Sequence, residues 1–123
     1  MLFRSLSGFE IVEPLAPRDG ETIIDKGLPN AFAGTELAKH LMATGRKNLI
    51  VGGFMTHMCV SATVRSATDN GFMSTIAADT VATRDLPDAT GGATLEAEAI
   101  NRITLAALSD RFAWIVPRAQ QIA

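Results

Sequence analysis

An apolar strand pattern runs directly into a glycine-rich turn and a cysteine in Asn48-Leu-Ile-Val-Gly-Gly-Phe-Met-Thr-His-Met-Cys59. Residues 48–51 are typical of a strand that is covered on both faces. Apolar residues at helical spacing follow over 58–70, and Gly71 ends that predicted helix. Ligands of open parallel sheets bind beyond the carboxyl ends of the strands, so we expect this turn to lie at a binding site.

The remaining segments alternate between predicted strands and helices. Further strands are predicted at 21–26, 72–77 and 112–116, further helices at 33–44 and 93–108, an extended piece at 9–12 and a loop at 79–90. This order predicts an α/β fold of three layers (α-β-α) around a mostly parallel, Rossmann-like sheet, in one domain over residues 1–123. In the last helix the predicted buried stripe consists of Leu95, Ala99, Ile103, Ala106 and Ala107.

Composition excludes several classes of function. The 11 Lys+Arg and 13 Asp+Glu residues give a net charge of −2, which leaves no basic field for nucleic acid. One cysteine excludes an internal disulfide, and two histidines make no convincing metal site. The longest apolar stretch is shorter than the roughly 20 residues that span a bilayer, and no signal-peptide pattern is present. We expect a cytoplasmic protein with no cofactor, metal, membrane or nucleic-acid partner.

The single cysteine, Cys59, is the candidate nucleophile. It is predicted in the first turn of a helix, where unpaired backbone N–H groups and the positive helix end stabilise a thiolate over a thiol. The same N–H groups can hold a developing oxyanion. A buried structural cysteine is the alternative, and the position alone leaves both open.

The residues around Cys59 resemble the nucleophile segment of the isochorismatase-like cysteine hydrolases, which include nicotinamidases and N-carbamoylsarcosine amidases. The family pattern is Gly-x-x-Thr-x-x-Cys-Val, found here over residues 53–60. Two further stretches match in order: Lys26 with residues 30–37 resembles the family's catalytic-lysine segment, and residues 79–84 resemble its Asp-rich loop. The resemblance covers about residues 9–116.

This resemblance implies a chemistry for the turn. Cys59 would attack the carbonyl of a small amide or carbamoyl substrate and form a thioester acyl-enzyme. Lys26 would favour the thiolate and orient the site. The backbone N–H groups of Met55 and Cys59 would form an oxyanion hole, with a cis peptide bond between Phe54 and Met55. Without the resemblance, Lys26 would be taken as a solvated surface charge.

Three further side chains are candidates for substrate binding. Phe32 matches an aromatic residue that commonly borders the family's pocket, and a place in the core is an equally open interpretation. Phe54 lies in the turn itself. His57, two residues before Cys59, is expected at the pocket rim or in a structural role, since the corresponding family position is not the catalytic base.

The resemblance also has gaps. The family's catalytic aspartate has no counterpart here, and two strands between the lysine strand and the strand at 48–51 are absent, as in an N-terminally truncated family fold. Asn101 stands where many relatives have histidine. We therefore expect exposed strand edges, a homo-oligomer, and little turnover by the chain alone. The alternative functions are vinyl-ether hydrolysis of the isochorismatase type and a non-catalytic domain that binds a ligand or partner.

Overall fold

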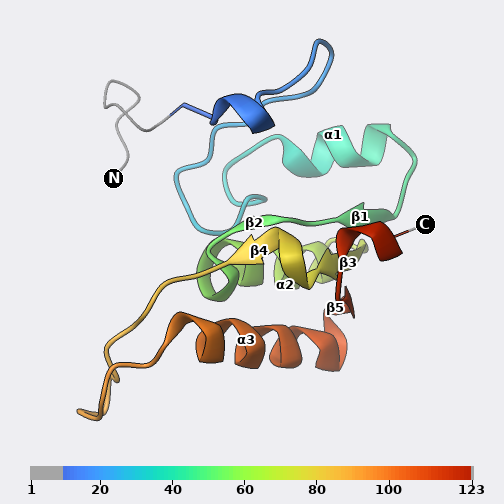
Figure 1. Ribbon diagram of the computed structural model, residues 1–123. Coiled ribbons are helices and arrows are strands. Elements are labelled where there is room, and N and C mark those ends of the chain that lie inside the picture. The colour runs from blue at the N-terminus through green and yellow to red at the C-terminus, as the bar shows by residue number, and fades with distance from the viewer. Residues whose placement is uncertain (1–9, 123) are drawn as a thin grey trace.

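The computed structural model describes residues 10–122, which form an α/β fold with parallel sheets (Figure 1). One sheet consists of β1 (Asn48–Ile50), β3 (Met73–Ala77) and β5 (Ala113–Val116), in the order β1-β3-β5, and all its strands are parallel. A second parallel pair joins β2 (Gly53–Phe54) to β4 (Val81–Ala82). The α/β class with a parallel sheet is confirmed.

The helical segments are, in chain order, η1 (Glu13–Leu15), α1 (Leu37–Ala43), η2 (Thr56–Val60), α2 (Ser61–Asp69), η3 (Ala78–Thr80), α3 (Ala97–Arg111) and η4 (Ala119–Gln121). Segment η2 is a π-helical turn, and the other η segments are 3₁₀ turns. Figure 1 shows α2 and α3 on one side of the sheet, and α1 with the segment before it on the other. No helix within residues 10–122 could span a bilayer.

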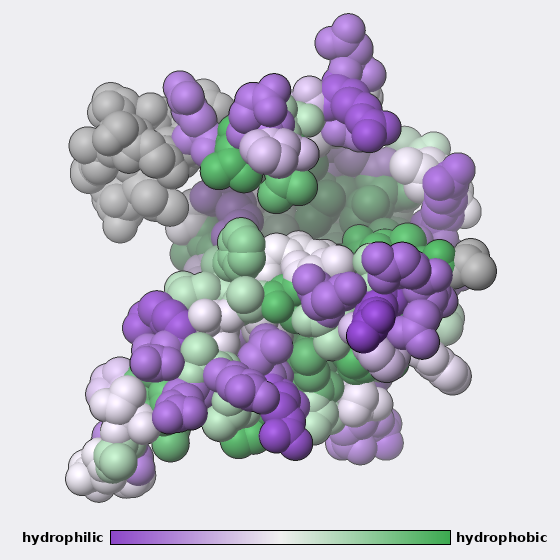
Figure 2. Space-filling view, viewed as in Figure 1, coloured by the Kyte–Doolittle hydropathy of each residue, from purple (hydrophilic) through white to green (hydrophobic). Residues whose placement is uncertain are grey.

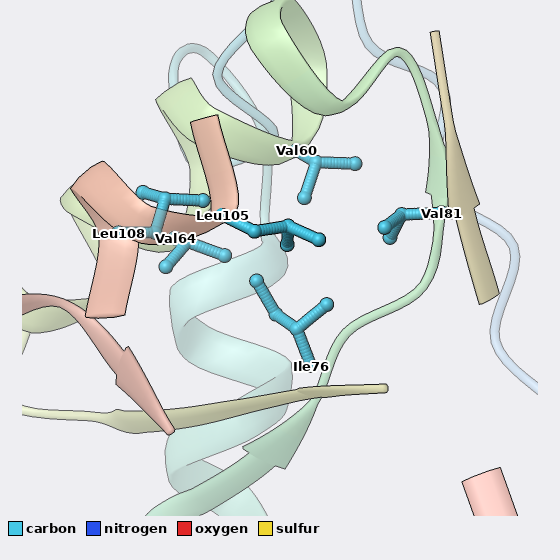
Figure 3. Packing of buried hydrophobic residues seen from close by; sticks show 6 residues of the cluster. All are labelled: Val60, Val64, Ile76, Val81, Leu105 and Leu108. Atoms are coloured by element: carbon cyan, nitrogen blue, oxygen red, sulfur yellow. The ribbon is translucent and has the colours of Figure 1, made fainter. Parts of the chain in front are cut away.

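The core lies between the sheet and helices α2 and α3. Its side chains come from η2, both of these helices, β3 and β4, and they converge in Figure 3: Val60, Val64, Ile76, Val81, Leu105 and Leu108. Val64, Ile76 and Leu108 are completely inaccessible to solvent. Burying a Val, Leu or Ile side chain contributes about 1.5–3 kcal/mol, so this cluster is what holds the cysteine turn to the sheet.

The opposite face of the sheet is exposed, which corrects the prediction that the strand at 48–51 is covered on both faces. Ile50, Met73 and Trp114 are 69%, 67% and 74% exposed, and the strand register places them on one face. Strand β1 stands at the sheet edge, with a hydrogen-bonded neighbour on the β3 side. Figure 2 shows a hollow with hydrophobic surface in its depth between the segment that carries α1 and the rest of the molecule.

The predicted strand at 21–26 does not form. This segment is irregular in the structure, because a β-branched run becomes a strand only when a neighbour pairs its backbone groups. The predicted extended piece at 9–12 forms no strand over 10–12, where Val12 has an extended backbone (φ −58°, ψ 142°) before η1, and Phe9 lies outside the described residues. The predicted loop at 79–90 holds most of η3 and all of β4, which pairs with the turn after β1.

Helix boundaries differ where side chains compete for the backbone. Residues 31–36 form turns instead of the first part of a helix, because the Thr35 hydroxyl donates to the Ala31 carbonyl and accepts from the Leu37 N–H. Gly45, at φ +69°, follows the end of α1 as predicted.

Helix α3 turns a different face to the core than predicted. Leu105 and Leu108 are buried, whereas Ile103 is 69% exposed. Leu95, which is 47% exposed, precedes the helix, because α3 begins at Ala97 and not at the predicted residue 93. The predicted stripe is therefore wrong. Apolar residues lie on more than one face of this helix, so spacing alone did not select the face that packs.

Candidate active site

Cys59 lies in the π-helical turn η2, which joins β2 to α2. The Met55 carbonyl accepts the N–H groups of both Met58 and Val60, at 3.0 and 3.2 Å, so the chain passes from strand to helix within a few residues. The α-helix predicted from residue 58 instead begins at Ser61, after this wider turn. Such π-turns are rare and occur frequently at functional sites.

The structure brings Lys26 against the sulfur of Cys59. The Lys26 Nζ donates to Sγ at 3.4 Å and to the Leu28 carbonyl at 3.0 Å. Cys59 is half-buried and Lys26 is exposed, so solvent screens part of this interaction. The contact agrees with the role that the resemblance implies for Lys26, because an adjacent ammonium group stabilises a thiolate.

The backbone of the turn needs its two glycines. Gly53 has φ +122°, a region that residues with a side chain rarely adopt. A Cβ on Gly52 would lie 3.2 Å from Thr80 Oγ1 and 3.3 Å from the Thr80 carbonyl oxygen. The peptide bond between Phe54 and Met55 is cis, as the resemblance implies.

Two hydrogen bonds attach the turn to later parts of the chain. Thr56 is fully buried, and its hydroxyl donates to Oδ1 of Asn101 at 2.5 Å. His57 shares a 2.5 Å hydrogen bond between its Nδ1 and the Thr83 hydroxyl. Within residues 10–122 the group that hydrogen-bonds to the Cys59 sulfur is Lys26, while His57 is bonded to Thr83. This arrangement agrees with a structural or rim role for His57.

The two phenylalanines differ in their surroundings. The Phe32 ring stacks on Phe72 with centroids 6.1 Å apart, and Phe72 is buried directly before β3. That contact lies toward the amino end of the sheet, whereas the cysteine turn follows the carboxyl end of β1, so it supports a core role for Phe32. Phe54 is 68% exposed beside the turn, where a ligand can reach it.

The Asp-rich segment has structural contacts. Asp79 Oδ1 accepts the Ala119 N–H at 2.9 Å and so holds the C-terminal turn, and Asp85 Oδ1 accepts the N–H of Ala97 at the start of α3. Farther along this loop, the hydroxyl and backbone N–H of Thr90 donate to Asp88 and hold the pKa of its carboxyl below its usual value.

Sequence inspection missed the partners of the turn. The family pattern marked Thr56 only as a motif position, and it marked Thr83 only as a member of the segment that resembles the Asp-rich loop. Asn101 stood out only as a departure from the family. Each partner lies on a segment far along the chain, so only the folded structure shows which of them contacts the turn.

Comparison with known proteins identifies the family. The profile of the Isochorismatase domain matches residues 2–120, nearly the whole chain. The chain belongs to the isochorismatase family. It is 34% identical over 107 residues to the secreted isochorismatase effector Isc1 of Verticillium dahliae, covering 87% of this chain and 53% of Isc1. It is 37% identical over 75 residues to an N-carbamoylsarcosine amidase of Arthrobacter sp, covering 61% of this chain and 28% of the amidase.

A solved isochorismatase-family structure shares the fold. An isochorismatase from Pseudomonas putida KT2440 superposes with a TM-score of 0.86 at 41% identity, covering 92% of this chain and 57% of that chain. The present chain thus spans about half the length of Isc1 and of the Pseudomonas putida protein. The Isochorismatase domain match, over residues 2–120, includes both Lys26 and Cys59.

Proposed function

We propose that this chain carries the nucleophile of a cysteine hydrolase, which cleaves the C–N bond of a small amide or carbamoyl substrate. The observation that carries this proposal is the 3.4 Å contact between Lys26 Nζ and Cys59 Sγ in a turn at the carboxyl end of the sheet. An ammonium group at that distance favours the thiolate, which is the attacking form of cysteine. The amidase among the relatives supports the choice of an amide substrate.

The proposed reaction has two halves. The Cys59 thiolate attacks the carbonyl carbon, a C–S bond forms, and the carbonyl electron pair moves onto oxygen, where the N–H groups of Met55 and Cys59 are the proposed donors. The C–N bond then breaks, and the amine leaves with a proton taken from solvent water. Water next attacks the thioester, the C–S bond breaks, and the acid and the thiolate are released.

The substrate is proposed to lie against the exposed side of the turn. Phe54 offers an accessible ring there, and His57 is held by Thr83 through its Nδ1. Phe32 is left out of this proposed contact surface, because its stacking on Phe72 supports a core role. A nucleophilic cysteine must stay reduced, which fits the proposed cytoplasmic location.

Protonation of the amine is the step this chain is least equipped to perform. A proton must be carried from the thiol, or from water, to the leaving amine, and the ammonium group that contacts the Cys59 sulfur within residues 10–122 has no lone pair with which to accept it. The family's aspartate has no counterpart in the sequence, and a general acid–base group is typically worth about 10²–10⁴-fold. We therefore propose that the chain alone is acylated at Cys59 but hydrolyses amides slowly.

A pair of acetyl donors tests this proposal. With p-nitrophenyl acetate, whose leaving group needs no proton, we expect a burst of nitrophenolate that acylates Cys59. With p-nitroacetanilide, whose amine must be protonated, we expect turnover about 10²-fold or more below that of an amidase of this family that has the catalytic aspartate. Stopped-flow absorbance follows both reactions. Absence of the ester burst would refute the proposed nucleophile, and rapid anilide turnover would show that another residue supplies the proton.

We also propose that the chain forms a homo-oligomer through the face that carries β1. The outer edge of β1 presents backbone groups, and Ile50, Met73 and Trp114 expose apolar surface beside it. An unpaired edge next to an apolar face favours pairing with another copy.

Light scattering tests the association. The measured mass should exceed the 13.0 kDa of one chain, and Ile50→Lys should lower it, because a charge on an edge strand opposes pairing. Ile103→Lys on α3 is the matched control, since Ile103 has the same 69% exposure as Ile50 but lies on another surface. A well-dispersed 13.0 kDa monomer of the unaltered chain would contradict the proposal.

A further inference from the structure

A buried hydrogen bond joins the cysteine turn to helix α3. Thr56, the first residue of η2, is fully buried, and its hydroxyl donates to Oδ1 of Asn101 at 2.5 Å. Asn101 lies in the second turn of α3, 45 positions later in the sequence, and is half-buried. This bond is a buried polar contact beside the apolar cluster to which η2 and α3 both contribute.

One turn further along both segments, the contact between η2 and α3 is apolar. Four residues after Thr56 stands Val60, and four residues after Asn101 stands Leu105, and these two side chains meet in the core (Figure 3). The contact between η2 and α3 is thus apolar at one end and hydrogen-bonded at the end where the turn begins. A typical hydrogen bond contributes only about 0.5–1.5 kcal/mol to stability, but it fixes distance and direction, which apolar packing does less strictly.

Because of its place in the turn, Thr56 can affect the backbone on either side of it when its side chain is held in one direction. It follows Met55 immediately and precedes Cys59 by three residues, so it stands between the two proposed oxyanion donors. The Met55 carbonyl is already held by the N–H groups of Met58 and Val60. With that carbonyl fixed, a displacement of the Thr56 side chain is transmitted to the backbone on both sides.

We infer that Asn101 is a positioning residue, which through Thr56 sets the direction of the backbone N–H groups of Met55 and Cys59. The inference rests on the proposed function and deepens it, because it assigns part of the oxyanion geometry to a side chain on α3. Asn101 touches neither the substrate nor the sulfur in this account. It acts on acyl transfer through the turn.

Two reactions of Cys59 separate positioning from simple stability. Alkylation by iodoacetamide needs an accessible thiolate but no oxyanion hole, whereas acylation by p-nitrophenyl acetate develops an oxyanion. Removing the hydrogen bond by Thr56→Val or Asn101→Leu should slow acylation about tenfold, which is less than the 10²–10³-fold lost with an entire oxyanion donor. Alkylation should change by less than about twofold, because the thiolate and Lys26 remain in place.

Conservative variants and a control complete the experiment. Thr56→Ser retains the donor and Asn101→Asp retains an acceptor, so both should recover most of the acylation rate. Thr68→Val removes a hydroxyl from α2 that bonds only weakly, at 3.4 Å, to the Val64 carbonyl, and should leave both rates unchanged. Urea unfolding of each variant shows that it is folded. If Thr56→Val fails to fold, Asn101→Leu and Asn101→Asp test the bond from its other end.

The outcomes distinguish this inference from the proposed function. If the unaltered chain is not acylated at all, the proposed function fails. If the unaltered chain is acylated and Thr56→Val and Asn101→Leu are acylated equally fast, only the positioning role is overturned. An equal fall in acylation and alkylation would also overturn it, since that pattern marks a general loss of structure.

Discussion

Replacement of Cys59 by Ala should abolish the burst with p-nitrophenyl acetate, a loss of roughly 10³-fold or more in the rate of acyl transfer. The sulfur is the only protein atom that forms a covalent bond to the substrate in the proposed reaction, so the burst should be lost with it. Cys59 is also the single cysteine of the chain, so labelling by iodoacetamide should disappear together with the burst.

Folding should survive this substitution. Cys59 is half-buried, and alanine removes only the sulfur, so the free energy of unfolding should change by about 1 kcal/mol or less. Urea titration measures this change. A Cys59→Ala variant that folds and still acylates at the unaltered rate would place the nucleophile elsewhere.

Replacement of Lys26 by Met should slow the alkylation of Cys59 at pH 7 about five- to tenfold. Two unit charges about 4 Å apart interact by about 1 kcal/mol in bulk water, and by more where protein displaces the water. Lys26 is exposed, so the smaller figure applies, and raising the salt concentration should bring the unaltered chain closer to the variant. The rate of iodoacetamide labelling measures the effect.

Lys39→Met is the matched control for charge. Lys39 lies on α1, where its ammonium is 3.2 Å from the carboxylate of Glu36, the residue before the helix, and its side chain is 83% exposed. Its removal therefore changes the net charge by the same amount, but at a distance from the turn. Lys26→Arg should keep part of the rate, because it keeps the positive charge. Equal alkylation rates in Lys26→Met and Lys39→Met would contradict the proposed role of Lys26 and show that it acts only as a surface charge.

Local sequence signals were sufficient to predict several strands and helix ends of this fold. The strands at 72–77 and 112–116 lie within one residue of β3 and β5, and Gly45 and Gly71 follow their helices at φ +69° and +80°. Glycine at a helix end adopts a backbone conformation that other residues avoid, so such positions can be recognised from the sequence without a partner. The strand-to-helix turn before Cys59 was recognised in the same way.

The predictions that were wrong concern features that depend on tertiary contacts. The segment at 21–26 has the composition of a strand, but within the described residues it joins neither of the two sheets. Helix α3 offers more than one apolar face, and packing on β3 and α2 selected the one with Leu105 and Leu108. The contact between Lys26 and Cys59 spans 33 positions, and family resemblance, not local sequence, suggested it.

Identification of the acylated residue tests the central claim most directly. After brief reaction with p-nitrophenyl acetate, intact mass spectrometry followed by peptide mapping should find one acetyl group per chain, on Cys59, and neutral hydroxylamine should remove it because it is held as a thioester. Acetyl groups found only on lysine side chains, resistant to hydroxylamine, would contradict the account.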